Sequence, residues 1–345
     1  MKLFLPAAAL LPLAVLSDSP TLRFEEGASL RQKWTVRTEK SVLSSTLRIM
    51  GNDQDIGAGL TVVRESARIA VDRFDKAEDG ALRALTRSYE SIVDRTDYDG
   101  ADEVEGAVFK GAGSKESLLN GLDVVFALDE DAEEFAASFA EGSEGDEDWL
   151  EDVRVEAHLE WLVPEDEVSE GDSWEVDPGS IASLLEPLSG SMVEEAPEAP
   201  DGPEGGIAIS APSPDERFDP AAMEGEITAR WASTDTDEGA RLATIELTVE
   251  LEATVDLIPE FNDDASERGA DEEYKVAEYE RTLAGELTVV WDLERDVPVS
   301  VAGELEGTAA YEVEWTLNAQ SMELELAASG ESEDTIQIEA AFSVE

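Results

Sequence analysis

The sequence predicts a mainly β protein with a minor α component: two curved antiparallel sheets, half-barrel or barrel-like, with a few short helices. Three observations support this fold class. Apolar and polar residues alternate along much of the C-terminal part of the chain, and a period of two is typical of strands with one buried face. Short turns rich in Gly, Asn, Asp and Glu join these runs, which favours antiparallel hairpins. Apolar residues make up 42% of the chain, which is enough to form hydrophobic cores.

The clearest strand runs from Leu242 to Leu257. Its apolar side chains all fall on one face and include Ile245, Leu247 and Val249, whereas Thr and Glu residues occupy the other face. At about 3.4 Å per residue this strand is roughly 50 Å long. Further alternating runs follow it: residues 287–293, 297–305, 311–317, 322–326 and 336–344. Gly303 and Gly307 suggest bends or bulges in a curved sheet.

The N-terminal part shows the same alternation less regularly. Leu30, Trp34 and Val36 alternate with polar residues, and residues 122–128 form another expected strand. The sequence Glu78-Asp79-Gly80 predicts a hairpin turn between residues 68–76 and 81–93. A helix is the alternative there, because Val63, Ala67, Ala70 and Phe74 have near-helical spacing.

Two short helices are expected, at residues 146–162 and 178–188. In the second, Asp177 is an N-cap residue before Pro178 at the first helical position. A Pro- and Gly-rich acidic linker at residues 191–220 separates an N-terminal β-rich domain (20–190) from a C-terminal antiparallel β domain (221–345).

Residues 1–17 read as a signal peptide. Lys2 precedes an apolar run from Leu3 to Leu16, which is short for a membrane span, and cleavage after Ser17 is expected. An uncleaved buried segment is the alternative. No later apolar run is long enough to cross a bilayer. We therefore expect an exported bacterial protein, located in the periplasm or outside the cell.

The net charge is −59, from 83 acidic and 24 basic residues. A polyanion of this size repels nucleic acids and anionic lipids, and attracts cations and basic partners. Residues 1–100 are nearly neutral, with 14 basic and 15 acidic residues. This asymmetry reflects either a docking surface or a drift in composition between domains. The overall acidity reflects either adaptation to salt or cation binding.

No residue pattern indicates an enzyme. The single histidine, His158, lies in an acidic stretch that is expected to be helical, and no Gly-x-Ser-x-Gly elbow, phosphate loop or dinucleotide motif occurs. The chain has no cysteine, which excludes disulfides and thiolate zinc sites. Carboxylate pairs could serve a hydrolase, but the tryptophans that would line a sugar site fit a core better: Trp161, Trp174, Trp231, Trp291 and Trp315.

Calcium is the one candidate ion, since hard cations prefer several oxygen ligands. Asp94, Asp97, Asp99 and Asp102 cluster around Gly100 in an expected loop and form a weak candidate site. The alternative is ordinary Asp/Gly turn chemistry. No other cofactor is expected.

Residues 161–174 also show a resemblance. Trp161-Leu162-Val163-Pro164 is followed by Gly171-Asp172-Ser173-Trp174. This pattern resembles uncharacterised exported bacterial proteins, built of two antiparallel β-sheet halves, in which a Leu-Pro step precedes a Gly-Asp-Ser/Thr-Trp turn. The chain is similar, more loosely, to periplasmic lipoprotein carriers. The resemblance implies an envelope protein and carries no catalytic residue.

Together these observations predict a non-enzymatic envelope or surface protein whose partner is unknown. Candidate partners are a hydrophobic small molecule or another envelope protein. If the apolar sheet faces enclose a void, they could hold a hydrophobic ligand; if side chains fill them, they are a core. The alternatives are a calcium-dependent adhesion module and a carboxylate-based hydrolase.

Overall fold

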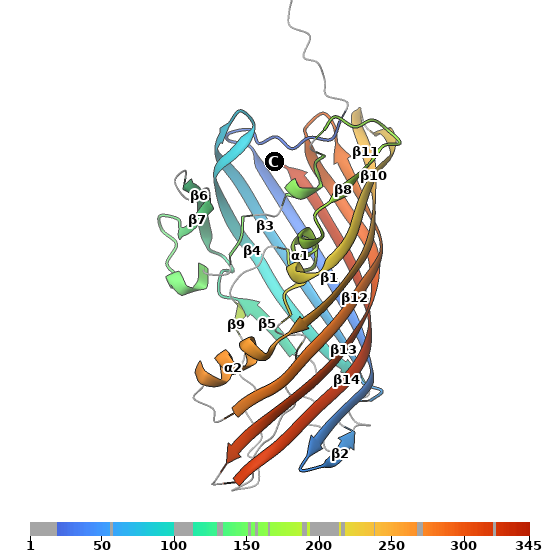
Figure 1. Cartoon of the computed structure of the whole chain (residues 1–345). Helices are drawn as coiled ribbons and strands as arrows, with labels where there is room; N and C mark the ends of the chain where they lie inside the picture. Colours follow the sequence, from blue (N-terminus) through green and yellow to red (C-terminus); the bar gives the residue numbers. More distant parts are fainter. Residues whose placement is uncertain are drawn as a thin grey trace, which may run out of the picture.

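The computed structural model describes residues 19–55, 58–99, 113–129, 134–150, 153–155, 158–164, 166–187, 192–193, 214, 218–237, 239–267, 272–319 and 322–345. Within these residues, 14 strands form one antiparallel sheet (Figure 1). The strands are β1 (Ser29–Ile49), β2 (Asn52–Asp55), β3 (Thr61–Glu78), β4 (Ala81–Asp99), β5 (Gly113–Ser117), β6 (Asp123–Asp129), β7 (Glu134–Phe139), β8 (Ser173–Val176), β9 (Met192–Val193), β10 (Glu224–Asp237), β11 (Ala240–Asp256), β12 (Glu272–Asp292), β13 (Val297–Ala319) and β14 (Met322–Val344).

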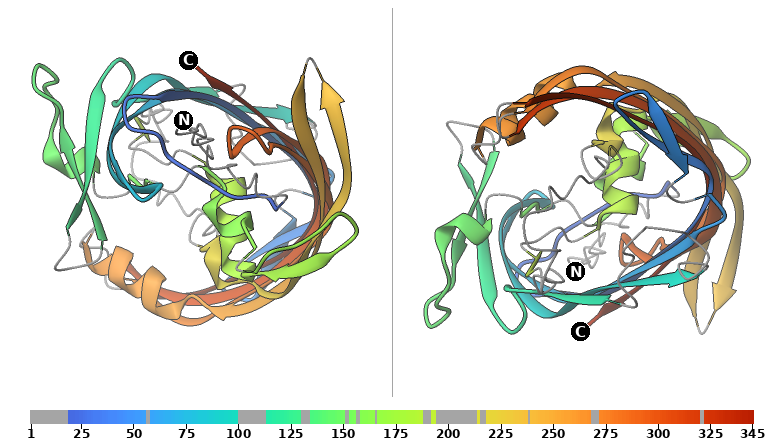
Figure 2. Two further views of the ribbon diagram at one scale, coloured as in Figure 1. Left: turned by 90° about the horizontal axis from the view of Figure 1, so that it is seen from above. Right: turned by 90° about the horizontal axis from the view of Figure 1, so that it is seen from below.

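The main path of the sheet has the order β7-β6-β4-β3-β1-β14-β13-β12-β11-β10-β8. β2 pairs with β1, and β5 pairs with β4 and β9. Viewed along its length, the sheet curls around an interior (Figure 2), but its two described ends, β7 and β8, do not pair. The prediction of a mainly β, antiparallel and barrel-like fold is therefore confirmed.

The two halves of the chain meet where β1 pairs with β14, over a register that runs from Leu30 with Val344 to Ile49 with Leu326. Strands from both predicted domains thus belong to the same sheet. The domain boundaries stay a prediction. The expected signal peptide (1–17) lies outside the described residues, as does most of the expected linker, of which only 192–193, 214 and 218–220 are described.

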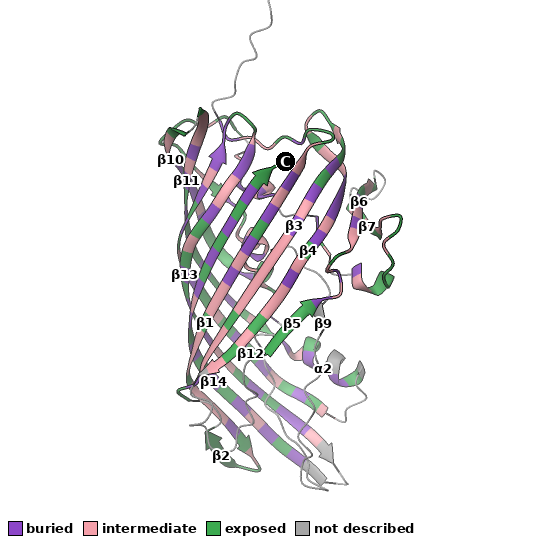
Figure 3. Cartoon of the chain, turned by 180° about the vertical axis from the view of Figure 1, so that it is seen from behind, coloured by how far each residue is buried: buried purple, intermediate pink, exposed green. Residues whose placement is uncertain are grey.

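Buried and exposed residues alternate along the long strands (Figure 3). In β11, the apolar residues from Ala243 to Ala253 are buried, whereas Glu246, Glu250 and Glu252 are exposed. This confirms the alternation expected for residues 242–257. The concave face is therefore apolar and the outward face of this part of the sheet is acidic. Trp231, Trp291 and Trp315 are buried as expected.

β13 is a single strand of 23 residues that joins two runs expected to be separate. It passes Gly303 and Gly307 without a shift in register. A Cβ atom on Gly303 would lie 2.4 Å from the carbonyl oxygen of Glu286 on β12, and one on Gly285 would lie 2.4 Å from that of Glu304. The backbones of β12 and β13 therefore approach too closely here for any side chain.

We expect Gly303→Ala to destabilise the fold by about 1–3 kcal/mol, because the new methyl group would force β12 and β13 apart. Urea unfolding of the variant and the parent chain measures this difference. Ala302→Val is the matched control, since Ala302 is the exposed neighbour on the same strand, and its effect should stay within about 0.5 kcal/mol. Equal midpoints for Gly303→Ala and the parent chain would contradict the close approach.

The hairpin expected at residues 78–80 is confirmed, and the alternative helix there is wrong. β3 and β4 pair antiparallel across Asp79 (φ 54°) and Gly80 (φ 84°). Two successive residues with positive φ fit the type I′ turn whose twist matches that of the flanking strands. Residues 63–74 belong to β3 despite their near-helical spacing, since they pair with β4 throughout.

α1 and the helical turns next to it lie on the concave side of the sheet (Figures 1 and 2). α1 (Ile181–Leu185) follows a 3-10 turn at Pro178–Ser180, where the Asp177 carboxylate accepts a hydrogen bond from the Gly179 amide, as an N-cap does. A further 3-10 turn covers Pro220–Ala222. α2 (Ile258–Glu267) packs Phe261 against Tyr274 of β12, with ring centroids 4.8 Å apart. No helix in the described ranges combines the length and hydropathy of a membrane span.

The helix expected at residues 146–162 is wrong. The described part of this region contains two 3-10 turns, Glu147–Leu150 and Glu160–Leu162. Leu159 has a φ of 61°, which an α-helix does not allow, and it is buried next to His158. Tertiary burial therefore overrides the local helical tendency of this acidic stretch.

Candidate functional site

An ion pair between β3 and β4 on the concave face holds the chain segment of residues 153–155, 158–164 and 166–187 that enters the interior, which we call the inserted chain. The Arg87 guanidinium of β4 donates two hydrogen bonds to the Asp72 carboxylate of β3, at 2.7 and 2.8 Å. Both side chains are completely buried. The same guanidinium donates to the carbonyl oxygens of Arg154 (2.8 Å) and Val155 (3.0 Å). The pair therefore holds the backbone of residues 154–155 against the sheet.

His158 joins this pair from the inserted chain. Its Nε2 lies 2.7 Å from Asp72 Oδ2, and its Nδ1 lies 3.0 Å from Glu160 Oε1. Gln32 of β1 donates to the same Asp72 oxygen at 2.7 Å. The rings of Phe24 and Phe74 pack edge-on against the imidazole, with centroids 5.4 and 5.6 Å away. We call Gln32, Asp72, Arg87, His158 and Glu160 the buried ion cluster.

The cluster keeps its charges although it is buried. Burial alone lowers the pKa of His158, but its hydrogen bonds to Asp72 and Glu160 outweigh burial and raise the pKa to about 9. Burial alone raises the pKa of Asp72, but the Arg87 and His158 charges hold it well below its usual range. His158 is therefore a cation at neutral pH with both ring nitrogens directed at carboxylates. This arrangement suits an anchor for the inserted chain.

A second arginine holds the inserted chain further along. Arg68 of β3 donates from Nη1 to the carbonyl oxygen of Pro187 at 2.6 Å, just after α1. Its Nε donates to the Ser66 hydroxyl at 3.0 Å. Burial lowers the pKa of Arg68, and the nearby Asp94 and Glu186 carboxylates act in the opposite direction. Residues 154–187 are thus anchored to β3 and β4 at two heights.

A cavity of about 330 Å³ remains between these anchors and the C-terminal strands. Its wall runs from β4, β3 and β1 onto the neighbouring strand β14 and on to β12, and the chain around α1 and Pro220 supplies the rest of the lining. Its lining residues are Val36, Thr38, Lys40, Val42, Val62, Arg64, Tyr98, Leu185, Glu186, Phe218, Pro220, Arg281, Asp334 and Ile336. We call this space the interior cavity.

The charged side chains that β12 and β14 contribute to the interior cavity form an ion pair. Arg281 of β12 donates to Asp334 of β14 at 3.1 Å, and its guanidinium lies 5.9 Å from the centre of the Phe218 ring. Lys40 of β1 lies opposite Asp334 in the register of β1 and β14, and Arg64 lies on β3. Among the described residues, side chains fill the interior around the buried ion cluster, whereas the interior cavity lies beside α1.

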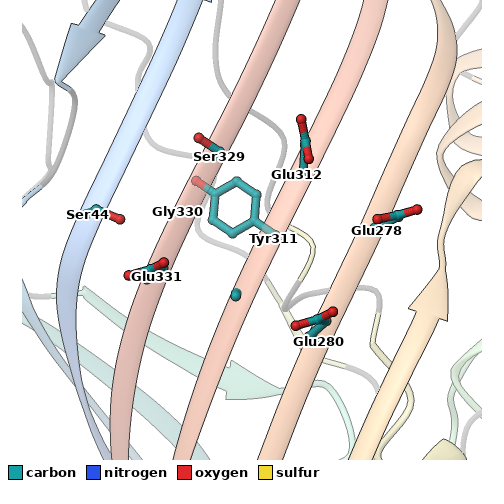
Figure 4. Close-up of a pocket in the computed structure, with 9 residues that line it drawn as sticks. Ser44, Glu278, Glu280, Tyr311, Glu312, Ser329, Gly330 and Glu331 are labelled. Carbon is teal, nitrogen blue, oxygen red and sulfur yellow. The ribbon is translucent and has the colours of Figure 1, made fainter.

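A second hollow, of about 260 Å³, lies on the outward face (Figure 4). Four glutamates surround it: Glu278 and Glu280 of β12, Glu312 of β13 and Glu331 of β14. Beneath it, the Tyr311 ring lies across Gly330, where a Cβ atom would meet the ring at 2.5 Å. The Tyr311 hydroxyl lies 3.3 Å from that of Ser45 on β1. This hollow follows from the fit of a tyrosine over a glycine on the neighbouring strand.

The described aspartates of the candidate calcium site lie on a strand and not in a loop. Asp94, Asp97 and Asp99 belong to β4, and Asp102 lies outside the described residues. Asp94 shares the concave face and accepts a hydrogen bond from Ser66, whereas Asp97 is exposed on the outward face. The strand alternation therefore separates these two carboxylates. Among the described residues, no three acidic or histidine side chains are arranged to hold a metal ion.

The sequence did not indicate the residues that matter most in the interior. His158 was expected on an acidic helix, and it is fully buried beside Asp72 instead. Lys40 and Arg64 share a face because β1 pairs with β3, and alternation within one strand does not show which strands pair. The sequence held one signal for the buried ion cluster. Most of the chain's arginines fall within its first 100 residues, and an arginine that is buried there needs a charged partner.

No known protein family matches the sequence, and no curated protein matches it. Among solved structures, an outer membrane channel from Pseudomonas putida F1 is similar with a TM-score of 0.23 and 10% identity, covering 94% of this chain and 98% of that one. The outer membrane protein OprG from Pseudomonas aeruginosa is similar with a TM-score of 0.21 and 7% identity, covering 94% and 99%. A likeness at this level assigns no ligand or activity to the chain.

Both similar structures are outer membrane proteins. They contradict the expected location free in the periplasm or outside the cell, because both come from the outer membrane. That expectation is corrected here and is not used below. Neither is a lipoprotein carrier, and the resemblance to exported bacterial proteins stays a prediction.

Proposed function

We propose that this chain is a non-enzymatic envelope protein that binds a small hydrophobic molecule in the interior cavity. The observation that supports this is the cavity itself. Its volume of about 330 Å³ falls at the lower end of the range of about 300–1,000 Å³ typical of ligand sites. Seven apolar side chains line it: Val36, Val42, Val62, Leu185, Phe218, Pro220 and Ile336.

The rigidity of the cavity walls supports a preformed site. Arg68 and the buried ion cluster fasten the inserted chain to β3 and β4 on one side. The ion pair of Arg281 and Asp334 joins β12 to β14 on the other. A ligand would then bind without having to order its own site, which reduces the entropic cost of binding. Binding in the interior cavity does not depend on the compartment in which the protein is located.

We expect the neutral apolar dye N-phenylnaphthylamine to bind the chain with one-to-one stoichiometry, and Val42→Trp to weaken this binding at least about tenfold. The indole would occupy the cavity that Val42 lines. Fluorescence titration measures both affinities.

Leu43→Trp is the matched control, because Leu43 is 51% exposed and directly follows Val42. Its affinity for the dye should equal that of the parent chain. Absence of dye binding to the parent chain, or equal weakening by both tryptophan variants, would refute binding in the interior cavity.

A further inference from the structure

The hairpin of β6 and β7 ends the sheet with an open edge. β7 stands at one end of the strand order and pairs with β6 alone, and the hairpin lies outside the curve of the sheet (Figures 1 and 2). The Ala140 amide donates to the Asp123 carbonyl oxygen of β6 at 2.9 Å. Because antiparallel strands bond through alternate residues, Phe135, Ala137 and Phe139 turn their backbone N–H and C=O groups to the other side. Within the part of the chain that the structure describes, these groups have no backbone partner.

The same three residues carry the apolar side of β7. Phe135, Ala137 and Phe139 are half-buried, whereas the residues between them are exposed. Their side chains pack at the margin of the hydrophobic core. In the register of the hairpin they lie beside three apolar residues of β6: Leu128, Phe126 and Val124. An apolar row therefore runs up to the open edge and stays partly exposed there.

The usual protection of an open edge is missing from β7. Edge strands are commonly blunted by lysine, proline, a bulge or a very short strand. Residues 135–139 contain no charged residue and no proline, and β7 pairs with β6 without a bulge. At the other end of the sheet, β8 has only four residues and includes Glu175. β7 is therefore the end of the sheet that is suited to accept another strand.

The sequence of β7 is complementary to itself in one register. An antiparallel pair of two copies of β7, centred on Ala137, places Phe135 of each copy opposite Phe139 of the other. The open backbone groups of all three residues then find partners. Cross-strand aromatic pairs contribute about 0.2–1 kcal/mol each. Glu134 comes to lie opposite Ala140 and not opposite another acid, so this register sets no like charges directly against each other.

We propose that two copies of this chain associate by antiparallel pairing of their β7 strands, so that the sheet of one copy continues into the sheet of the other. Each copy has a net charge of −59, which opposes the approach of two copies. The uncharged edge at residues 135–139 is where they can meet with the least repulsion. We therefore expect the association to strengthen as salt rises to about 0.5 M. It does not depend on what the interior cavity binds.

A single cysteine tests the register, because the chain has none of its own. In Ala137→Cys the two cysteines would face each other in a hydrogen-bonded pair with Cα atoms about 5.5 Å apart, which a disulfide can span. We expect mild oxidation at about 0.5 M salt to convert most of this variant into a covalent dimer, as seen by non-reducing electrophoresis.

Glu134→Cys is the matched control. Glu134 is more exposed than Ala137 on the same strand, but it would face Ala140, and the two cysteines would lie about 20 Å apart along the strands. This variant should remain monomeric on the non-reducing gel. Equal cross-linking of the two variants, or none in Ala137→Cys, would overturn the pairing of β7 with β7.

Sedimentation equilibrium of the parent chain and of Ala137→Pro gives a second test. The Ala137 amide faces the open edge, so proline leaves the bonds to β6 in place, as edge strands allow, and removes a donor at the centre of the pairing. We expect a dimer for the parent chain and a dissociation constant raised at least about tenfold in the variant. An unchanged far-UV circular dichroism spectrum shows that the variant is folded. A monomeric parent chain, or an equally stable dimer of the folded proline variant, would refute the proposal.

Discussion

Replacement of Asp72 with alanine is expected to lower the free energy of unfolding by about 3–5 kcal/mol, the usual cost of removing one partner from a buried ion pair. The variant would leave the Arg87 guanidinium buried without its carboxylate. It would also remove the Asp72 oxygen shared by His158 and Gln32. Two cations would then face each other in the interior.

Urea unfolding followed by tryptophan fluorescence measures the loss. Asp53→Ala is the control, since Asp53 pairs with Arg48 at 2.6 Å on the surface and both side chains are more than half exposed. That change should cost less than about 1 kcal/mol. If the two variants lose the same stability, the buried ion cluster does not anchor the inserted chain.

Stability is expected to fall as the pH rises from about 6.5 to above 9, and His158 is the cause. Its pKa is raised from 6.5 to about 9 in the folded chain. The folded state therefore binds the proton more tightly than the unfolded state does. The resulting stabilisation is complete below pH 6.5 and disappears as the pH passes 9. At 1.36 kcal/mol per pH unit, the loss is about 3 kcal/mol.

Urea unfolding at pH 6 and pH 9.5 checks this expectation, with His158→Gln as the comparison. Glutamine cannot take up the proton, so the difference in stability between the two pH values should shrink by about 3 kcal/mol in the variant. The groups facing His158 do not titrate in this window, because the pKa of Asp72 is far below it and that of Arg87 is raised above it. An equally steep decline in His158→Gln would assign the pH dependence to other residues.

The strands with one solvent-exposed face and one buried face were predictable from the sequence, whereas the contacts in the interior were not. The run from Leu242 to Leu257 alternates without interruption because β11 pairs with β10 and β12 with a single bulge. A local signal of this kind needs no knowledge of the partners. The turn at Asp79-Gly80 was predictable for the same reason, since it depends on two adjacent residues.

The interior cavity and the buried ion cluster depend on pairings between distant parts of the chain. Lys40 lies opposite Asp334 only because β1 pairs with β14. His158 contacts Asp72 across 86 residues of sequence. Lys40 and Arg64 lie side by side only because β1 pairs with β3, and alternation within each strand does not reveal that pairing. The candidate calcium site stays a prediction, and three of its aspartates lie on β4, which extends through residues expected to form a loop.

The seam between β1 and β14 joins the first and last long strands of the chain. During synthesis, β1 emerges early and pairs with β3, but its other edge has no partner until the residues from Met322 onward are available. Such distant pairings slow folding, and an open edge invites pairing with other chains. Completion of this fold is therefore a late event, and the nascent chain depends on protection of that edge until β14 arrives.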